Sequence, residues 1–276
     1  MGGLARRASF VEKEKSEGNA VLIVDSGRLF TDEKKGADPQ LSLTKARMIS
    51  RAYTRMGVAA INMSAADLTL GLPFFRNEAT QGLPLISANL MNPGGKSLIF
   101  SPYTIKKVGK VRIALFGLTS PAKNQTVIHP PENKFILGDP VKSARKIFRK
   151  LRQHADIIIL LSDLDAKKER EVIKAVPGIH FVLGGQDGRY MHTPLWGGRT
   201  PILESYKNGM YAGMLRLTVV NTSSPFTYKG MEETPRDAEE SKGSNRFSWT
   251  LVPLHTSLPE DREISSWIQQ SGIEKD

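Results

Sequence analysis

Four loops that follow predicted strands carry the residues whose types suggest chemistry. They span residues 26–30, 62–70, 162–165 and 184–190. In α/β proteins ligands bind where the carboxyl ends of strands meet such loops. Asp67, Asp163 and Asp187 each lie in one of these loops, and carboxylate oxygens are the ligands that Mg²⁺ and Ca²⁺ prefer. A new carboxylate cluster is therefore one interpretation, and the other is that these aspartates are turn and cap residues.

Arg28 offers a different chemistry in the first loop. A guanidinium group can hold an anion through two parallel hydrogen bonds without any metal, so Arg28 is a candidate anion-binding residue. The alternative is an ion pair with Asp163 or Asp187, and we favour the ion pair.

Short apolar runs that end in turn residues predict the strands before these loops. We expect strands at residues 20–25, 58–62, 85–88, 156–161, 180–183, 201–206, 210–220 and 247–253, and a hairpin of 101–108 with 111–117. Helical spacing predicts helices at residues 41–56, 72–80, 140–154, 166–175 and 259–271. Residues 228–246 hold almost no large apolar side chain and predict an exposed loop. Strands that alternate with helices and then give way to strands indicate a mixed α/β sandwich with helices outside.

Composition limits the classes of function. The 276 residues include 39 Lys and Arg against 28 Asp and Glu, a net charge of +11 that favours an anionic partner. The basic helix at residues 141–154 lacks the interleaved aromatic residues that stack on bases, so nucleic acid is not expected. The absence of cysteine excludes disulfides, zinc–thiolate sites and cysteine nucleophiles. No apolar run approaches the roughly 20 residues of a membrane-spanning helix, and no signal peptide is visible.

Several motifs resemble those of the calcineurin-like metallophosphoesterases, in particular the N-terminal domain of the 5'-nucleotidase branch. They are the segments VDSG at residues 24–27, DLTLGLP at 67–73, PLISANL at 84–90, VPGIHFVLGG at 176–185 and TPILESYKNGMYAGMLRL at 200–217. The resemblance implies a four-layer α-β-β-α sandwich of two mixed sheets flanked by helices. It also implies one domain at residues 1–257, a linker-like helix at 258–276, and a periplasmic or extracellular location.

The same resemblance shows which metal-binding positions have changed. Members of the family hydrolyse phosphate esters with two divalent metals. Their first motif would precede Gly2 and Gly3, so we expect that motif, and the first strand with it, to be missing. By alignment with the remaining motifs, the family's ligand positions are occupied here by Arg28, Ala65, Ala66, Asp163, Gln186 and Gly188. None of the five histidines matches a ligand position, and Asp25 matches a residue that orders its loop.

These substitutions predict no catalytic residue, no metal and no cofactor. The first hypothesis is a catalytically degenerate protein that acts as a binding or structural subunit, with another protein or a larger complex as its partner. The alternative is a residual metal-dependent phosphoesterase or 5'-nucleotidase whose first motif lies outside this sequence. A second alternative is a metal-free binder of a phosphorylated small molecule through Arg28.

Overall fold

The computed structural model describes residues 3–30, 38–120, 134–206, 208–230 and 243–272. Its helices are α1 (Leu4–Ser16), α2 (Pro39–Met56), the 3₁₀ turn η1 (Asp67–Leu70), α3 (Leu72–Thr80), α4 (Pro140–Leu151), α5 (Ala166–Ala175) and α7 (Arg262–Gln270). Its first strands are β1 (Val24–Asp25), β2 (Ala60–Asn62), β3 (Leu85–Ile86), β4 (Leu90–Met91), β5 (Tyr103–Val108), β6 (Val111–Leu118) and β7 (Ile136–Leu137). The later strands are β8 (Ile157–Ser162), β9 (Phe181–Gly184), β10 (Leu195–Gly197), β11 (Thr200–Glu204), β12 (Tyr211–Thr218), β13 (Phe226–Tyr228) and β14 (Asn245–Pro253).

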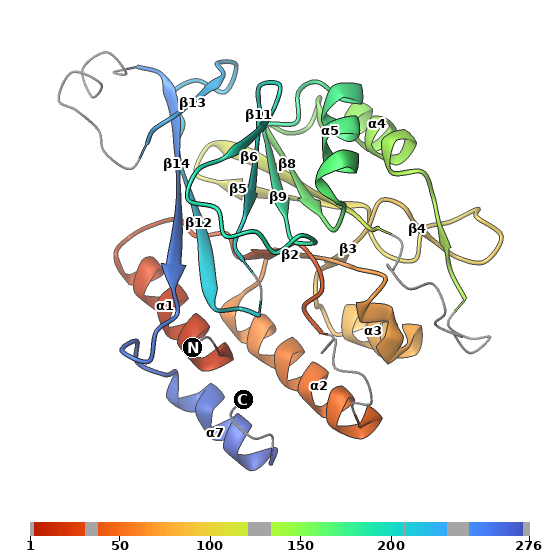
Figure 1. The fold of residues 1–276 in the computed structure, drawn as a ribbon, viewed down its shortest axis with the longest axis vertical. Coiled ribbons are helices and arrows are strands. Elements are labelled where there is room, and N and C mark those ends of the chain that lie inside the picture. Colours follow the sequence, from red (N-terminus) through yellow and green to blue (C-terminus); the bar gives the residue numbers. More distant parts are fainter. Residues whose placement is uncertain (1–2, 31–37, 121–133, 207, 231–242, 273–276) are drawn as a thin grey trace.

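A mixed six-stranded sheet in the order β10-β11-β9-β8-β6-β5 forms the centre of the molecule (Figure 1). Helices α4 and α5 cover one of its faces (Figure 1). The core between them and the sheet contains Phe116, Leu160, Val182, Ala144 and Val172, all of which are buried. Strands β8 and β9 are parallel and joined through α5, the predicted β-α-β unit.

Two three-stranded sheets pack against the opposite face of the central sheet. One has the order β1-β2-β3 and the other the order β12-β14-β13. Side chains from all three sheets form a single core cluster that includes Ala60, Leu115, Phe181 and Trp249. Helices α1, α2, α3 and α7 lie beyond β1-β2-β3, on its outer side (Figure 1). The predicted α-β-β-α sandwich is confirmed, except that its second β layer consists of two separate sheets instead of one.

Local sequence patterns predicted the ends of several helices and strands correctly. The Asp139 side chain accepts a hydrogen bond from Lys142 N at 2.8 Å and caps α4, whose first residue is Pro140. Gly57 ends α2 in the left-handed conformation with φ 75°. Helices α3 and α5 have the predicted bounds, and β5 with β6 form the predicted hairpin.

Other predictions need correction. Strand β1 spans only residues 24–25 of the predicted strand at 20–25, because pairing with β2 covers only Val24 and Asp25. The expected loop at residues 228–246 is bounded by strands on both sides, since β13 ends at Tyr228 and β14 begins at Asn245. Residues 231–242 of that loop lie outside the described residues. The short strands β4, β7, β10 and β13 were not predicted.

The C-terminal helix α7 packs against the rest of the fold. Its N-cap is Asp261, and Ile264 is fully buried. Arg55 of α2 pairs with Asp261 at 3.0 Å, and the guanidinium of Arg51 stacks 3.6 Å from the centre of the Trp267 ring. Within the described residues, no helix has the length and apolar character needed to cross a bilayer.

Candidate functional site

The four predicted loops meet at the carboxyl ends of β1, β2, β8 and β9. Gly27 lies at the centre, where a Cβ atom would be 3.3 Å from the carbonyl oxygen of Asn62 and 3.5 Å from the Cβ of Asp163. Ser26 Oγ donates to the carbonyl oxygen of Gly184 at 3.1 Å. Gly27 has a φ of 119°, a conformation that L side chains rarely adopt. Glycine is therefore required for this close approach of the loops.

Asp67 organises the first two loops through backbone hydrogen bonds. Its carboxylate is fully buried and accepts from Arg28 N at 3.0 Å and Phe30 N at 2.9 Å. The Ser64 hydroxyl donates to the same carboxylate at 2.6 Å. Burial raises the pKa of Asp67, and these donors oppose the rise. Asp67 therefore acts as a turn residue in this structure.

Arg28 forms an ion pair with Asp163, one of the two partners that the sequence offered. Its Nε donates to Asp163 Oδ1 at 2.9 Å, and the two side chains are 20% and 2% exposed. Asp163 Oδ2 accepts from Ser120 N at 3.2 Å. Burial raises the pKa of Asp163 to about 7, although Arg28 lowers it. Arg28 has a φ of 60°, a left-handed conformation that is unfavourable for a non-glycine residue and is held here by contacts to two aspartates.

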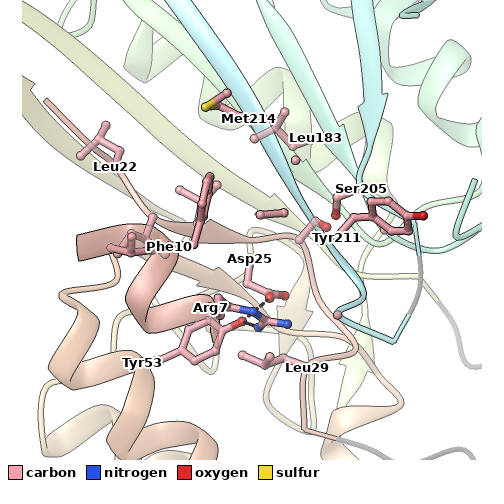
Figure 2. Close-up of a pocket in the computed structure, with 18 of the residues that line it drawn as sticks. Arg7, Phe10, Leu22, Asp25, Leu29, Tyr53, Leu183, Ser205, Tyr211 and Met214 are labelled. Atoms are coloured by element: carbon pink, nitrogen blue, oxygen red, sulfur yellow. Dashed lines mark hydrogen bonds between the residues drawn. The ribbon is translucent and has the colours of Figure 1, made fainter. Parts of the chain in front are cut away.

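Asp25 is half-buried at the end of β1 and binds its own loop. Its Oδ1 accepts from Gly27 N at 3.0 Å, and its Oδ2 accepts from the hydroxyl of Tyr53 at 3.1 Å. Arg7 of α1 donates to the same Tyr53 hydroxyl (Figure 2). Burial raises the pKa of both Asp25 and Tyr53. These two hydrogen bonds link Arg7 of α1 and Tyr53 of α2 to Asp25, and so hold both helices against the end of β1.

The other predicted site positions carry little ligand chemistry. Ala65 is buried and Ala66 half-buried, immediately before η1, so methyl groups occupy these two positions. Gln186 is half-buried in the loop after β9, and Gly188 has a φ of 58° and no side chain. Asp187 was the other partner predicted for Arg28. Its carboxylate pairs with Arg189 instead, with Oδ2 3.6 Å from Arg189 Nη2.

This arrangement does not fit two divalent metals. Asp163, which follows β8 and would face such metals, is instead paired with the cation Arg28. A guanidinium group has no lone pair to donate to a metal. Among the residues that the structure describes, no three His, Cys, Asp or Glu side chains gather closely enough to hold a metal ion. The described side chains of the arrangement carry charge that can be recognised by a ligand of opposite charge.

A second charged cluster was missed by the sequence analysis. Arg189 donates through Nε to Glu204 Oε1 at 3.1 Å and through its backbone N to Oε2 at 2.8 Å. Glu169 of α5 is fully buried beside them, with Arg189 Nη2 at 3.8 Å from its Oε2. Burial raises the pKa of Glu169 to about 8, against the lowering effects of the Ser162 hydroxyl and Arg189. Gly184 borders this cluster, since a Cβ there would lie 2.8 Å from Glu169 Oε1, and no local sequence pattern indicates that residues 169, 189 and 204 meet.

Comparison with known sequences identifies distant relatives. A snake venom 5'-nucleotidase from Gloydius brevicauda is 24% identical over 241 residues, which cover 78% of this chain and 40% of the venom protein. An uncharacterized metallophosphoesterase of Bacillus subtilis, YunD, is 26% identical over 210 residues, covering 69% and 43% of the two chains. No family model matches the sequence. The chain thus spans less than half the length of these relatives.

Solved structures share the fold across nearly the whole chain. Sulfate thiohydrolase SoxB from Thermus thermophilus superimposes with a TM-score of 0.78 at 18% identity and covers 98% of this chain and 46% of its own. The calcineurin-like phosphoesterase YfkN from Bacillus subtilis gives a TM-score of 0.72 at 18% identity, covering 98% and 88%. A 5'-nucleotidase precursor, also from Thermus thermophilus, gives 0.71 at 19% identity, covering 98% and 52%. The relatives and structural neighbours are 5'-nucleotidases and metallophosphoesterases, so the resemblance seen in the sequence is confirmed.

Proposed function

We propose that this chain uses a phosphoesterase fold for binding instead of catalysis, as a binding or structural component of a protein assembly. The observation that carries the proposal is the ion pair of Arg28 with Asp163 at the centre of the four loops. Both charges are satisfied within the protein, because Asp163 also accepts from Ser120 N. A metal could enter only by displacing a guanidinium from a carboxylate that is 2% exposed.

The surrounding positions support the same proposal. Ala65 and Ala66 provide no lone pairs, Gly188 provides no side chain, and Gln186 provides one neutral amide. Catalysis by a metal pair requires several anionic or imidazole ligands in fixed geometry. A single substitution would leave such a site weakened. Here the family's ligand position is changed in each of the four loops, and Asp163 alone of the replacing residues has an anionic side chain.

Two other functions compete with this proposal. Because the matched relatives are named as nucleotidases and phosphoesterases, any activity of this chain would be hydrolysis of phosphate esters, with the family's first motif supplied from outside the sequence. The second competing function is metal-free binding of a phosphorylated small molecule. Arg28 would then have to release Asp163 and pair with the phosphate of the ligand. We also propose action outside the cytoplasm, which the venom relatives support.

Hydrolysis assays separate binding from catalysis. The purified chain is incubated with AMP and with bis(p-nitrophenyl) phosphate in the presence of Mn²⁺, Zn²⁺ or Mg²⁺, beside the Arg28→Met and Asp163→Asn variants. We expect all three proteins to show the same background rate. Turnover in the unmodified chain that either substitution abolishes would overturn the proposal. Binding of AMP in calorimetry that Arg28→Met abolishes, without turnover, would favour the metal-free binder.

A further inference from the structure

Helix α4 presents a surface made only of cations. Every exposed side chain of Pro140–Leu151 belongs to Lys or Arg: Lys142, Arg145, Lys146, Arg149 and Lys150. Arg152 follows the helix directly and is also exposed. Residues 140–155 contain six Lys and Arg and no Asp or Glu, within a chain whose net charge is +11. More than half of the excess charge therefore lies on this one segment.

The cations of α4 are not neutralised by carboxylates of the described residues, since none of the salt bridges found there includes them. Arg145 Nε donates instead to the carbonyl oxygen of Ala175 at 3.3 Å. Arg145 and Arg149 are four residues apart, as are Lys142 and Lys146, so like charges repel along the helix. Lys142 also lies in the first turn, where the helix dipole disfavours a cation. An anionic surface would offset both unfavourable effects.

Helix α5 extends the same surface. The two helices lie side by side on the central sheet (Figure 1), and the hydrogen bond from Arg145 to Ala175 joins them. Three exposed cations of α5 lie three and four residues apart, and so share one face of the helix: Lys167, Arg170 and Lys174. Of the two glutamates of α5, Glu169 is buried and Glu171 pairs with Lys168. We call the exposed cations of α4 and α5 the basic face.

The composition of the basic face selects among anionic partners. Protein interfaces have an apolar core and are poor in Lys, whereas no exposed side chain of α4 is apolar. Single-stranded nucleic acid is bound with aromatic rings that stack on bases, and none of the exposed side chains of α4 is aromatic. An anionic lipid surface requires only cations, and about four to eight Lys and Arg on an amphipathic helix are typical of such contacts. Since α4 has 12 residues, its cations extend over about 18 Å, enough to meet several lipid headgroups.

We propose that the basic face docks this protein on a bilayer rich in anionic phospholipids. The apolar side of α4 is already buried in the core, through Ala144, Ile147 and Leu151, so the helix stays in the fold and the contact is electrostatic. The four loops lie at the carboxyl ends of their strands, whereas α4 leads into the amino end of β8. The basic face is thus separate from the four loops, and its binding to lipid goes beyond the proposed function and does not rest on it.

Vesicle binding tests the docking proposal. The 276-residue chain is titrated with vesicles of phosphatidylcholine alone and with vesicles that also contain phosphatidylglycerol, and bound protein is measured by sedimentation. At about 0.1 M salt we expect binding only to the vesicles with phosphatidylglycerol, and at about 1 M salt, where the screening length is about 3 Å, we expect that binding to be lost. Equal binding to both kinds of vesicle, or no binding, would overturn the proposal. Tighter binding to a DNA duplex or to polyglutamate at the same ionic strength would identify another class of partner and also contradict it.

Substitutions locate the contact with the vesicle. The first variant removes three charges from the basic face: Lys146→Gln, Arg149→Gln and Lys150→Gln. Each cation near an anionic bilayer strengthens binding about fivefold, so this variant should bind about a hundredfold more weakly. The control variant removes three exposed cations from other elements, with the same change in net charge: Lys13→Gln, Arg47→Gln and Lys96→Gln.

The control variant should change binding less than about threefold, because charges farther than a Debye length from the bilayer are screened. Equal weakening in the two variants would show that net charge alone drives binding, and would contradict the docking proposal. If the first variant fails to fold, the comparison of vesicles and salt still decides, because it uses the unmodified chain. None of these outcomes depends on metal or hydrolysis, so lipid docking and the loss of catalysis can fail separately.

Discussion

The loops around Arg28 and the cluster around Arg189 differ in how well their buried carboxylates are satisfied. At the loops, Asp67 and Asp163 accept hydrogen bonds from backbone and side-chain donors. In the Arg189 cluster, Glu169 is fully buried, and Arg189 Nη2 lies 3.8 Å from its Oε2. The comparison shows that close partners surround the carboxylates of the loops, whereas Glu169 has a more distant cation.

The physical reason for the difference is the cost of burying charge. Buried carboxylates without partners are strongly unfavourable, and the structure resolves this at the loops with Arg28. At Glu169 the same cost appears as a pKa raised to about 8 by burial. The two regions should therefore respond differently to the loss of a charged partner and to pH.

The largest expected effect is loss of the cation at the loops. Arg28→Met removes the charge but keeps an apolar stem, and it leaves Asp163 buried without its partner. The free energy of unfolding at pH 8 should fall by about 3–5 kcal/mol, measured by urea denaturation. Arg112→Ala breaks a pair of which Arg112 is 48% exposed, and should lower the free energy of unfolding far less, because water screens an exposed pair. Equal losses in the two variants would show that the Arg28 pair is not a buried one.

The second prediction concerns pH and Glu169. Its pKa is raised from 4.5 to about 8 in the folded chain, so between these values the folded state binds more protons than the unfolded state. Stability contributed by this group is therefore present below pH 4.5 and is lost as the pH rises toward 8. Glu169→Gln should be more stable than the unmodified chain at pH 8 by roughly 2–4 kcal/mol, and nearly equal to it at about pH 4.5.

A control for the pH prediction lies on the same helix. Glu171 has a 39% exposed side chain and pairs with Lys168, so Glu171→Gln is the matched control: it removes an exposed carboxylate from α5 and leaves the buried one in place. Denaturation midpoints across the pH range supply both comparisons. A parallel pH profile for Glu169→Gln and the unmodified chain would show that Glu169 is not protonated in the folded state.

Much of the fold was predictable because its signals are local. The Asp139-Pro140 pair and Gly57 define helix ends within one or two residues of themselves. Strands β10 and β13 could not be predicted, because each has three residues and exists only through pairing with a strand elsewhere in the chain. Strand β1 is short for the same reason, since β2 is its one partner among the strands that the structure describes.

The site was predictable in part. The sequence placed Arg28, Ala65, Asp163 and Gln186 in converging loops, but it offered Arg28 two partners. The structure pairs Arg28 with Asp163, while Asp187 lies near Arg189. The choice depends on loops 135 residues apart, which no local pattern encodes. The division of the sequence into a domain at residues 1–257 and a linker-like helix at 258–276 stays a prediction.

The most direct test of the account is metal content. The purified chain is dialysed against Mn²⁺ and then against metal-free buffer, and the retained manganese per chain is measured by elemental analysis, with Asp163→Asn beside it. The account predicts far less than one manganese ion per chain in both proteins. One or two ions per unmodified chain, lost in Asp163→Asn, would show that the Arg28 pair opens to metal and would contradict the account.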